Sequence, residues 1–203
     1  IINVNITDDN VIEATESFRI TLSGITGGIV TLGNTTADGT ITDNDEAVVS
    51  IDSPASITEG NNIVFTVSVD KAVQGGFTVE FNTADGNATT AGLDYTSKTG
   101  TINFAGNQNE SHTIVVNTNN DNVVEATETM TASLGTITNY NGTVTVSGTN
   151  GTGTGTLLDN DYAAITIADV SGAENGGDIT VSLVLDVDVD EAFTVNVNTS
   201  DGT

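Results

Sequence analysis

The sequence contains no cysteine and no tryptophan, and it has one proline and three basic residues among 203. Without cysteine, a disulfide framework and thiol chemistry are excluded. With so few bases, nucleic-acid binding is excluded, because no basic patch can displace counterions from phosphates. An anionic membrane surface would repel the chain. No apolar run approaches the roughly 20 residues of a bilayer span, and no signal peptide or lipidation motif is visible, so we expect no direct membrane insertion.

Catalytic residue types are equally scarce. The single histidine, His112, lies on a predicted strand, where we expect it to be exposed, and it has no nucleophile in reach for a triad. Paired carboxylates can hydrolyse glycosides, but a sugar cleft normally offers aromatic platforms, and aromatic residues make up only 4% of this chain. Lys71 and Lys98 lie in no pattern diagnostic of an isopeptide cross-link, and we expect both to be exposed. The sequence therefore predicts no enzyme.

The abundant residues indicate β-structure. Hydrophobic residues make up 36% of the chain, mostly Val, Ile and Ala, and Thr, Asn and Gly are also frequent. Thr and Val favour a pleated, half-buried surface, whereas Gly, Asn and Asp favour tight turns. This composition predicts an all-β protein.

Several phrases occur twice in the same order. "DNVIEATE" at 9–16 returns as "DNVVEATE" at 121–128, 112 residues later; "DND" at 43–45 returns at 159–161, and "FTVEFNTADG" at 77–86 returns as "FTVNVNTSDG" at 193–202, both 116 residues later. Such spacing indicates a tandem array. We expect the chain to be a segment of that array, with the C-terminal part of a first repeat at 1–45, a complete repeat at 46–161 and the N-terminal part of a third at 162–203. A single pseudo-symmetric domain is the weaker alternative, because its half-units would have to complete each other.

Within the complete repeat the hydrophobic period is two. Phe65, Val67 and Val69, for example, alternate with polar residues. The pattern, divided by turn signals such as "DG" and "NG", predicts strands near 47–52, 62–70, 76–83, 99–105, 111–118, 128–134, 143–147 and 152–158. The last strand lies in the glycine-rich segment 147–156, which resembles a linker, but its place inside the repeat favours a strand or hairpin. These strands predict an immunoglobulin-like antiparallel β-sandwich whose strand order the sequence leaves open.

The formal net charge is −25, and seven acids of the complete repeat that lie outside strands fall in four segments. In a sandwich, alternate loops gather at one end, so the four segments can meet there. Their seven carboxylates belong to Glu59, Asp85, Asp121, Glu125, Glu128, Asp159 and Asp161.

Seven carboxylates at one end of a domain repel one another strongly. Two like charges ~4 Å apart cost about 1 kcal/mol in water and several at an effective dielectric near 20. None of the three bases lies inside the acidic phrases, so a hard divalent cation is the simplest solution. Ca²⁺ takes six to eight oxygen ligands in flexible geometry, whereas Mg²⁺ keeps its waters and Zn²⁺ prefers Cys and His. For a single acid a solvated loop residue is the alternative, but four segments repeated at matching spacing favour calcium.

In order, the phrases "TEG", "TADG", "AGLDY", "DNVVEATE" and "DND" resemble those of Calx-beta domains. These are immunoglobulin-like calcium-binding modules of sodium–calcium exchangers and of many bacterial surface proteins. The resemblance covers the complete repeat and both partial ones. It implies calcium ligands at the seven acids named above, together with the backbone carbonyl of Val123.

The sequence departs from the family pattern at two positions. The calcium sensors of the family often have Asp where this chain has Asn120 and Asn160, so we expect fewer ions or weaker binding in the complete repeat. The first partial repeat has Asp8 in place of Asn120, and the two junctions are therefore expected to differ in calcium affinity. Its candidate ligands are Asp8, Asp9, Glu13, Glu16, Asp43 and Asp45, and those of the third repeat are Glu174 and Asp201. Asp38 lies in a second "TADG" that belongs by repeat position to a last strand, so it is left out.

Together these features predict a structural role. We expect a calcium-binding segment of a long bacterial cell-surface adhesin, extracellular, in which Ca²⁺ stiffens the junctions between repeats and each repeat's partner is its neighbour. An external surface or glycan ligand would bind through other regions, and attachment or gliding motility is the setting by analogy. The alternative is a regulatory calcium sensor of a membrane protein. Affinity separates them, because extracellular modules bind Ca²⁺ at ~10⁻⁴–10⁻³ M and sensors at ~10⁻⁷–10⁻⁵ M.

Overall fold

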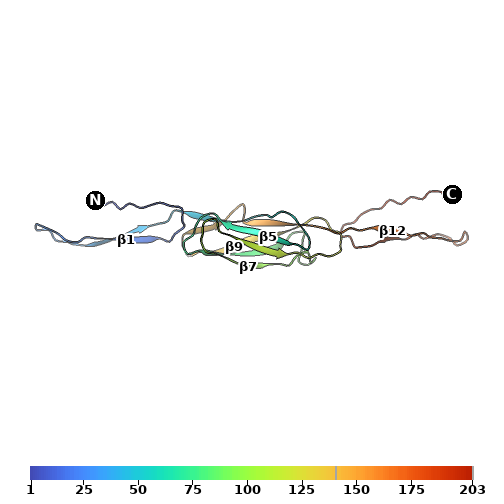
Figure 1. Cartoon of the computed structure of the whole chain (residues 1–203), viewed down its shortest axis with the longest axis horizontal. Helices are drawn as coiled ribbons and strands as arrows, with labels where there is room; N and C mark the ends of the chain where they lie inside the picture. Colours follow the sequence, from blue (N-terminus) through green and yellow to red (C-terminus); the bar gives the residue numbers. More distant parts are fainter. Residues whose placement is uncertain (140, 203) are drawn as a thin grey trace.

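The computed structural model describes residues 1–139 and 141–202. A β-sandwich occupies the middle of an elongated molecule, a two-stranded hairpin lies on either side of it, and the two chain ends lie on opposite sides of the sandwich (Figure 1). Within the described part of the chain, no helix is long and apolar enough to cross a membrane.

Two sheets form the sandwich. The first has the order β10-β3-β5-β8, and its strands are β3 (Glu46–Ile51), β5 (Asn62–Val69), β8 (Ser111–Asn117) and β10 (Thr143–Val146). The second has the order β4-β11-β9-β6-β7, and its strands are β4 (Ile57–Thr58), β6 (Phe77–Asp85), β7 (Thr99–Phe104), β9 (Glu128–Asn139) and β11 (Thr152–Leu158).

The core lies between these sheets. Alternate residues of each strand point inward, as the pleat requires, and Phe65, Val67 and Val69 of β5 are at most 1% exposed. The rings of Phe77 and Phe104 stack with centroids 4.7 Å apart. The apolar alternation of the sequence is therefore the packing pattern of the sandwich, and the prediction of an all-β, immunoglobulin-like fold is confirmed.

Three details differ from the sequence-based expectation. The strand β4 is too short, at two residues, to leave a periodic pattern. The strand β9 continues beyond 134, because a register shift opposite Val79 and Phe81 absorbs the break at Gly135. The sandwich is not wholly antiparallel, since the edge strands β10 and β4 pair in parallel with β3 and β11.

The glycine-rich segment forms strand β11, as its position inside the repeat indicates, and is not a linker. Thr and Gly alternate, and the glycines face the core. A Cβ atom at Gly153 would lie 2.0 Å from the carbonyl oxygen of Asp52, and one at Gly155 would lie 2.8 Å from Cδ1 of Ile63. Glycine is therefore required where β11 lies closest to the opposite sheet.

The flanking hairpins repeat strand pairs of the sandwich. Strand β1 (Glu16–Thr21) pairs with β2 (Thr36–Ile41) so that Glu16 faces Ile41, and in the sandwich Glu128 faces Leu157. Strand β12 (Ile165–Ile167) pairs with β13 (Leu183–Leu185) as β3 pairs with β5. Positions 112 and 116 residues apart thus adopt the same pairing and register.

Two of the residues expected to be exposed are partly buried. His112 lies half-buried on β8, with its Nε2 2.9 Å from Oε1 of Glu110 and its ring edge-on to Phe104. Lys71 is also half-buried, because it forms an ion pair with Asp45. Lys98 is exposed, as expected, and its Nζ donates to the carbonyl of Val115.

Candidate metal centre

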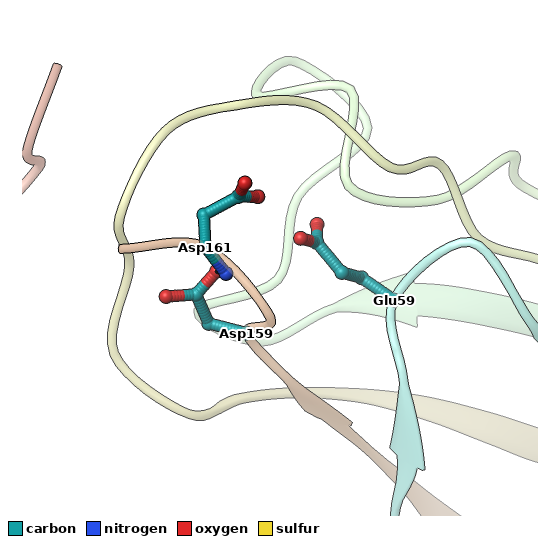
Figure 2. A group of neighbouring side chains, drawn as sticks. All are labelled: Glu59, Asp159 and Asp161. Atoms are coloured by element: carbon teal, nitrogen blue, oxygen red, sulfur yellow. The ribbon is translucent and has the colours of Figure 1, made fainter. Parts of the chain in front are cut away.

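Four loops of the complete repeat meet at one end of the sandwich. Glu59 follows β4, and Asp159 and Asp161 follow β11, the strand that pairs with β4. Figure 2 shows these three side chains together, with the carboxylates of Glu59 and Asp161 facing one another. Asp121, Glu125 and Glu128 arrive on the connection between β8 and β9. We call this end, with Asp94, the acidic pole.

The carboxylates of the acidic pole form three linked groups. Within each, one oxygen from every member lies within 4.8 Å of the others. The groups are Glu59 with Asp159 and Asp161, Glu59 with Asp121 and Glu125, and Asp94 with Glu125 and Glu128. Glu59 joins the first two and Glu125 the last two, so the acids form one continuous cluster. A cavity of about 10 Å³ between them has the size of roughly one water-sized sphere.

Glu59 is the buried centre of the cluster. It is 8% exposed, and its Oε1 has no hydrogen-bond partner among the described residues, nor has Oδ2 of Asp161. Burial, the adjacent carboxyl of Asp161 and the charges of Asp121 and Asp159 raise the pKa of Glu59 to about 7. Buried carboxylate oxygens without donors are costly, and a bound cation is a partner that satisfies both oxygens.

The other carboxylates of the cluster are shifted in the same direction. Burial, followed by the charges of Asp94 and Glu125, raises the pKa of Glu128 to about 7. Burial also raises the pKa of Glu125, and among the charges that add to it are those of Asp121 and Asp190. Asp190 lies in segment 162–203, so a charge from outside the sandwich also acts on the carboxylates of the acidic pole.

One sequence-predicted acid lies outside these groups and one unpredicted acid lies within them. Asp85 ends strand β6, and its carboxylate accepts hydrogen bonds from the Tyr95 hydroxyl at 2.6 Å and from Thr90. The Tyr95 hydroxyl bond lowers the pKa of Asp85. Asp94 takes part in its place. The residue before it, Leu93, has a φ of 73°, an unfavourable turn for a branched side chain. The signal for Asp94 was present in the phrase "AGLDY".

The acidic loop of the first repeat and that of the complete repeat each contain the same three hydrogen bonds at equivalent positions. In the first repeat Asp9 accepts from the Val11 N–H at 2.8 Å, and Asp43 accepts from the N–H groups of Glu13 and Asp45 at 2.9 and 3.1 Å. Their counterparts in the complete repeat are Val123 to Asp121 at 2.7 Å, Glu125 to Asp159 at 3.1 Å and Asp161 to Asp159 at 3.0 Å. The two loops are thus built alike.

The carboxylates of the first repeat are less closely gathered than those of the complete repeat. Asp8, Asp9, Glu13, Asp43 and Asp45 line a cleft of about 270 Å³, but no three carboxylates of residues 1–45 come as close together as those of the acidic pole. Residues 1–45 contain no counterpart of Glu59, which centres the other cluster. Glu16 is exposed at the start of β1.

A lysine neutralises part of this first site. Lys71, from the complete repeat, places its Nζ 2.8 Å from Oδ1 of Asp45, and this hydrogen bond raises the pKa of Lys71. The sequence places no base inside the acidic phrases, yet folding brings one to them. The position 116 residues later is Val187, so the second junction has no such cation.

The remaining candidates lie apart from these groups. Glu174 and Asp201 are exposed and belong to none of the three carboxylate groups. Asp38 lies on β2 and pairs with Arg19 at 2.6 Å, and is not part of the site. Asn160 donates to Asn120 at 2.7 Å, so these amides bond to each other at positions where acids would add charge.

The donor set fits a calcium ion. The residues of the acidic pole offer only oxygen ligands, and their carboxylates are gathered in a partly enclosed space. Two of their buried oxygens have no donor among the residues that the structure describes. Carboxylate oxygens in a flexible arrangement suit Ca²⁺, and no thiol or imidazole belongs to any of the three groups, which disfavours Zn²⁺.

Comparison with known proteins adds a family match. The sequence model of one family, described as Calx-beta domain, matches residues 1–45, 42–170 and 159–203. No curated protein matches the sequence. Solved structures similar to this chain include the apo-form Calx CBD1 domain, with 18% identity over 57% of this chain and 98% of that chain and a TM-score of 0.46. A second is CBD12 from CALX1.2, with 14% identity over 68% of this chain and 68% of that chain and a TM-score of 0.49. A third is the calcium binding domain CBD12 of CALX1.1, with 20% identity over 58% of this chain and 49% of that chain and a TM-score of 0.49.

Proposed function

The chain belongs to the Calx-beta domain family, and from that premise we propose that it is a structural segment of a repeat array in which calcium stiffens the junctions. Its cofactor is Ca²⁺. Glu59, Asp94, Asp121, Glu125, Glu128, Asp159 and Asp161 would hold the ion or ions in the complete repeat. The proposed role is not enzymatic, since calcium would neutralise the carboxylates of the acidic pole and hold its loops together.

One observation carries this proposal. Glu59 is nine-tenths buried among acids, and none of the described residues 1–139 and 141–202 donates a hydrogen bond to its Oε1. A soluble domain gains nothing from burying such a group unless something compensates its charge. A cation at this position would join the end of β4 to the end of β11, and thus the start of the repeat to its end.

The position of the acids favours an effect on the junction. Asp45 lies directly before β3 of the complete repeat, and Asp161 lies four residues before β12 of the third. A cation held by the aspartates of either "DND" phrase, 43–45 or 159–161, would therefore fix the segment that leads into the next repeat. We propose repeat units at 1–45, 46–161 and 162–203, and the recurrent strand pairs and loop hydrogen bonds support that division.

We further propose an extracellular setting on a bacterial surface, in a long adhesin, with attachment or gliding motility as its context. The strong acidity, the absence of cysteine and the repeated domains support this proposal. A surface or glycan ligand would be bound by other regions.

The regulatory sensor is the competing function, and calcium affinity distinguishes the two. The paired amides of Asn120 and Asn160 lower the charge of the site, which favours the weak binding of a structural module. We expect calorimetric titration of the whole chain to give a Kd of ~10⁻⁴–10⁻³ M, and calcium at ten times the Kd to add about 1.4 kcal/mol of stability. A submicromolar Kd would support the sensor and overturn the structural proposal.

A further inference from the structure

Each acidic loop carries two adjacent apolar residues between its carboxylates. The second of the two is Ile12, between Asp9 and Glu13, in the first repeat, and Val124 takes the same place in the complete repeat. Neither residue can ligate a cation through its side chain. What each of them contacts is a segment of the following repeat.

At the first junction the contact is a short piece of parallel sheet. Ile12 pairs with Val73; its N–H donates to the carbonyl of Ala72 at 2.9 Å, and its own carbonyl accepts from the N–H of Gln74 at 2.8 Å. Ile12 is fully buried, although it lies outside the complete repeat, and Val73 is 1% exposed.

The side chain of Ile12 fits closely against the complete repeat. A Cβ atom placed on Gly142 would lie 2.1 Å from its Cγ2, so a glycine there leaves room for it. Ile12 belongs to the same continuous core cluster as the inward residues of the sandwich. The first repeat thus contributes a residue to the hydrophobic core of the second.

At the second junction the same contact recurs. Val124 pairs in parallel with Val189, its N–H donates to the carbonyl of Asp188 at 2.9 Å, and the N–H of Asp190 donates to the carbonyl of Val124 at 3.0 Å. These residues lie 112 and 116 residues after their counterparts at the first junction. Repetition at both junctions indicates a standard contact rather than an accident of one loop.

We propose that Ile12 and Val124 are docking residues that join each repeat to its successor, through segment 72–74 at the first junction and 188–190 at the second. We propose further that docking and calcium binding are coupled, because the docking residue and the carboxylates share one short loop. Ordering that loop for one event reduces the entropic cost of the other, and the coupling is reciprocal. The coupling rests on the proposed calcium function, whereas the docking contact does not.

Substitution of Ile12 in the whole chain tests the contact. In Ile12→Asn, the amides of Ile12 and Gln74 should exchange with deuterium at least tenfold faster in NMR-detected exchange, because both are bonded only across the junction. The amides of Phe65 and Ile114, in the sandwich core, should keep their rates and show that the complete repeat remains folded. Val4→Asn, at a site 46% exposed and outside the junction, is the matched control.

The second junction provides an independent variant. Val124→Asn should accelerate exchange at Val124 and Asp190 and leave Ile12 and Gln74 unchanged. If the cross-junction amides of either variant exchange as in the unsubstituted chain, the docking proposal is overturned.

The coupling has its own readout. The calcium Kd of Val124→Asn, measured by calorimetric titration, should be at least threefold higher than the Kd of the unsubstituted chain. An unchanged calcium Kd in Val124→Asn overturns the coupling. If the unsubstituted chain gives no heat with calcium, the proposed calcium function fails instead, and the exchange rates still decide the docking contact.

Discussion

Two glutamates of the complete repeat have opposite electrostatic environments. Glu110 accepts hydrogen bonds from the N–H groups of Ala105, Gly106 and Asn107 and from His112. Burial raises the pKa of Glu110, but these donors outweigh it and lower the pKa to about 2. Glu59 instead faces acids, and its Oε1 has no hydrogen-bond partner in the part of the chain that the structure describes. Donors of the protein compensate the charge of Glu110, whereas a cation is the partner that suits Glu59.

Removing the charge of Glu59 should have opposite effects with and without calcium. In Glu59→Gln, the metal-free chain should become more stable by about 1 kcal/mol, the order of one close like-charge contact. Its calcium affinity should fall at least tenfold, because two of the three carboxylate groups lose their common member. Thermal unfolding with and without chelator measures both effects. Glu80→Gln, on the exposed face of β6, is the control; a metal-free loss of stability in Glu59→Gln would contradict the account.

The raised pKa values of Glu59 and Glu128 predict the pH dependence of the metal-free chain. A carboxyl with a folded pKa of about 7 and an ordinary value of 4.5 favours the folded state when protonated. Its contribution is complete below pH 4.5 and is lost as the pH rises through 7. We therefore expect the melting temperature without calcium to fall between pH 5 and pH 8, and calcium affinity to rise over the same range. A double Gln variant at 59 and 128 should flatten both trends.

Most members of the acidic cluster were predictable from the sequence, and the exceptions have physical causes. Six of the seven acids predicted for the complete repeat lie in the three close groups, because their loops leave strands at one end of the sandwich. Asp85 ends β6 and Asp94 lies in the connection that follows it, and only the fold shows that Tyr95 and Thr90 donate hydrogen bonds to Asp85. The pairing of Lys71 with Asp45 depends on how two repeats meet, which spacing along one chain does not reveal.

Among the secondary-structure elements, β11 depends most strictly on its residue types. Gly153→Val would place a side chain where a single Cβ already lies 2.0 Å from the Asp52 carbonyl oxygen. We expect a loss of about 3 kcal/mol or more, at the upper end of overpacking costs. Thr154→Val, on the exposed face of the same strand, should change stability by less than about 0.5 kcal/mol. Urea denaturation of both variants measures the difference, and equal effects would refute the close approach of the sheets.

Element positions were largely predictable because both sheets bury one face, which imposes a period of two on each strand. The strand order was not predictable, since the alternation of β3 or β11 is the same whichever neighbour it has. The parallel edge pairs β10-β3 and β4-β11 depend on where the chain crosses between sheets, and no local residue pattern encodes that crossing.

Over the whole molecule, the two junctions share a docking contact and differ in charge. The first has Lys71 beside Asp45, whereas the second has Val187 at that position and Asp190 adding negative charge near Glu125 and Glu128. The first junction should therefore depend less on calcium than the second.

Amide exchange in chelator tests this difference. The Ile12 amide should stay protected when calcium is removed, while the Val124 amide loses protection. Lys71→Met should abolish the advantage of the first junction, and Lys98→Met, at an exposed lysine of the same repeat, should preserve it. Equal loss at both junctions of the unsubstituted chain would show that Lys71 does not replace a cation.

The parallel pairing of β4 with β11 has a mechanical consequence. Tension applied through the two chain ends enters the complete repeat before β3 and leaves it after β11, so β4 is pulled from its N-terminal side and β11 from its C-terminal side. The strands are then sheared past each other, so their hydrogen bonds bear the load together instead of opening one at a time. Glu59 and Asp159 follow directly on these strands, and a cation bound by both would cross-link β4 to β11 and resist their separation. We expect single-molecule pulling to show an unfolding force for the complete repeat that falls sharply when calcium is removed.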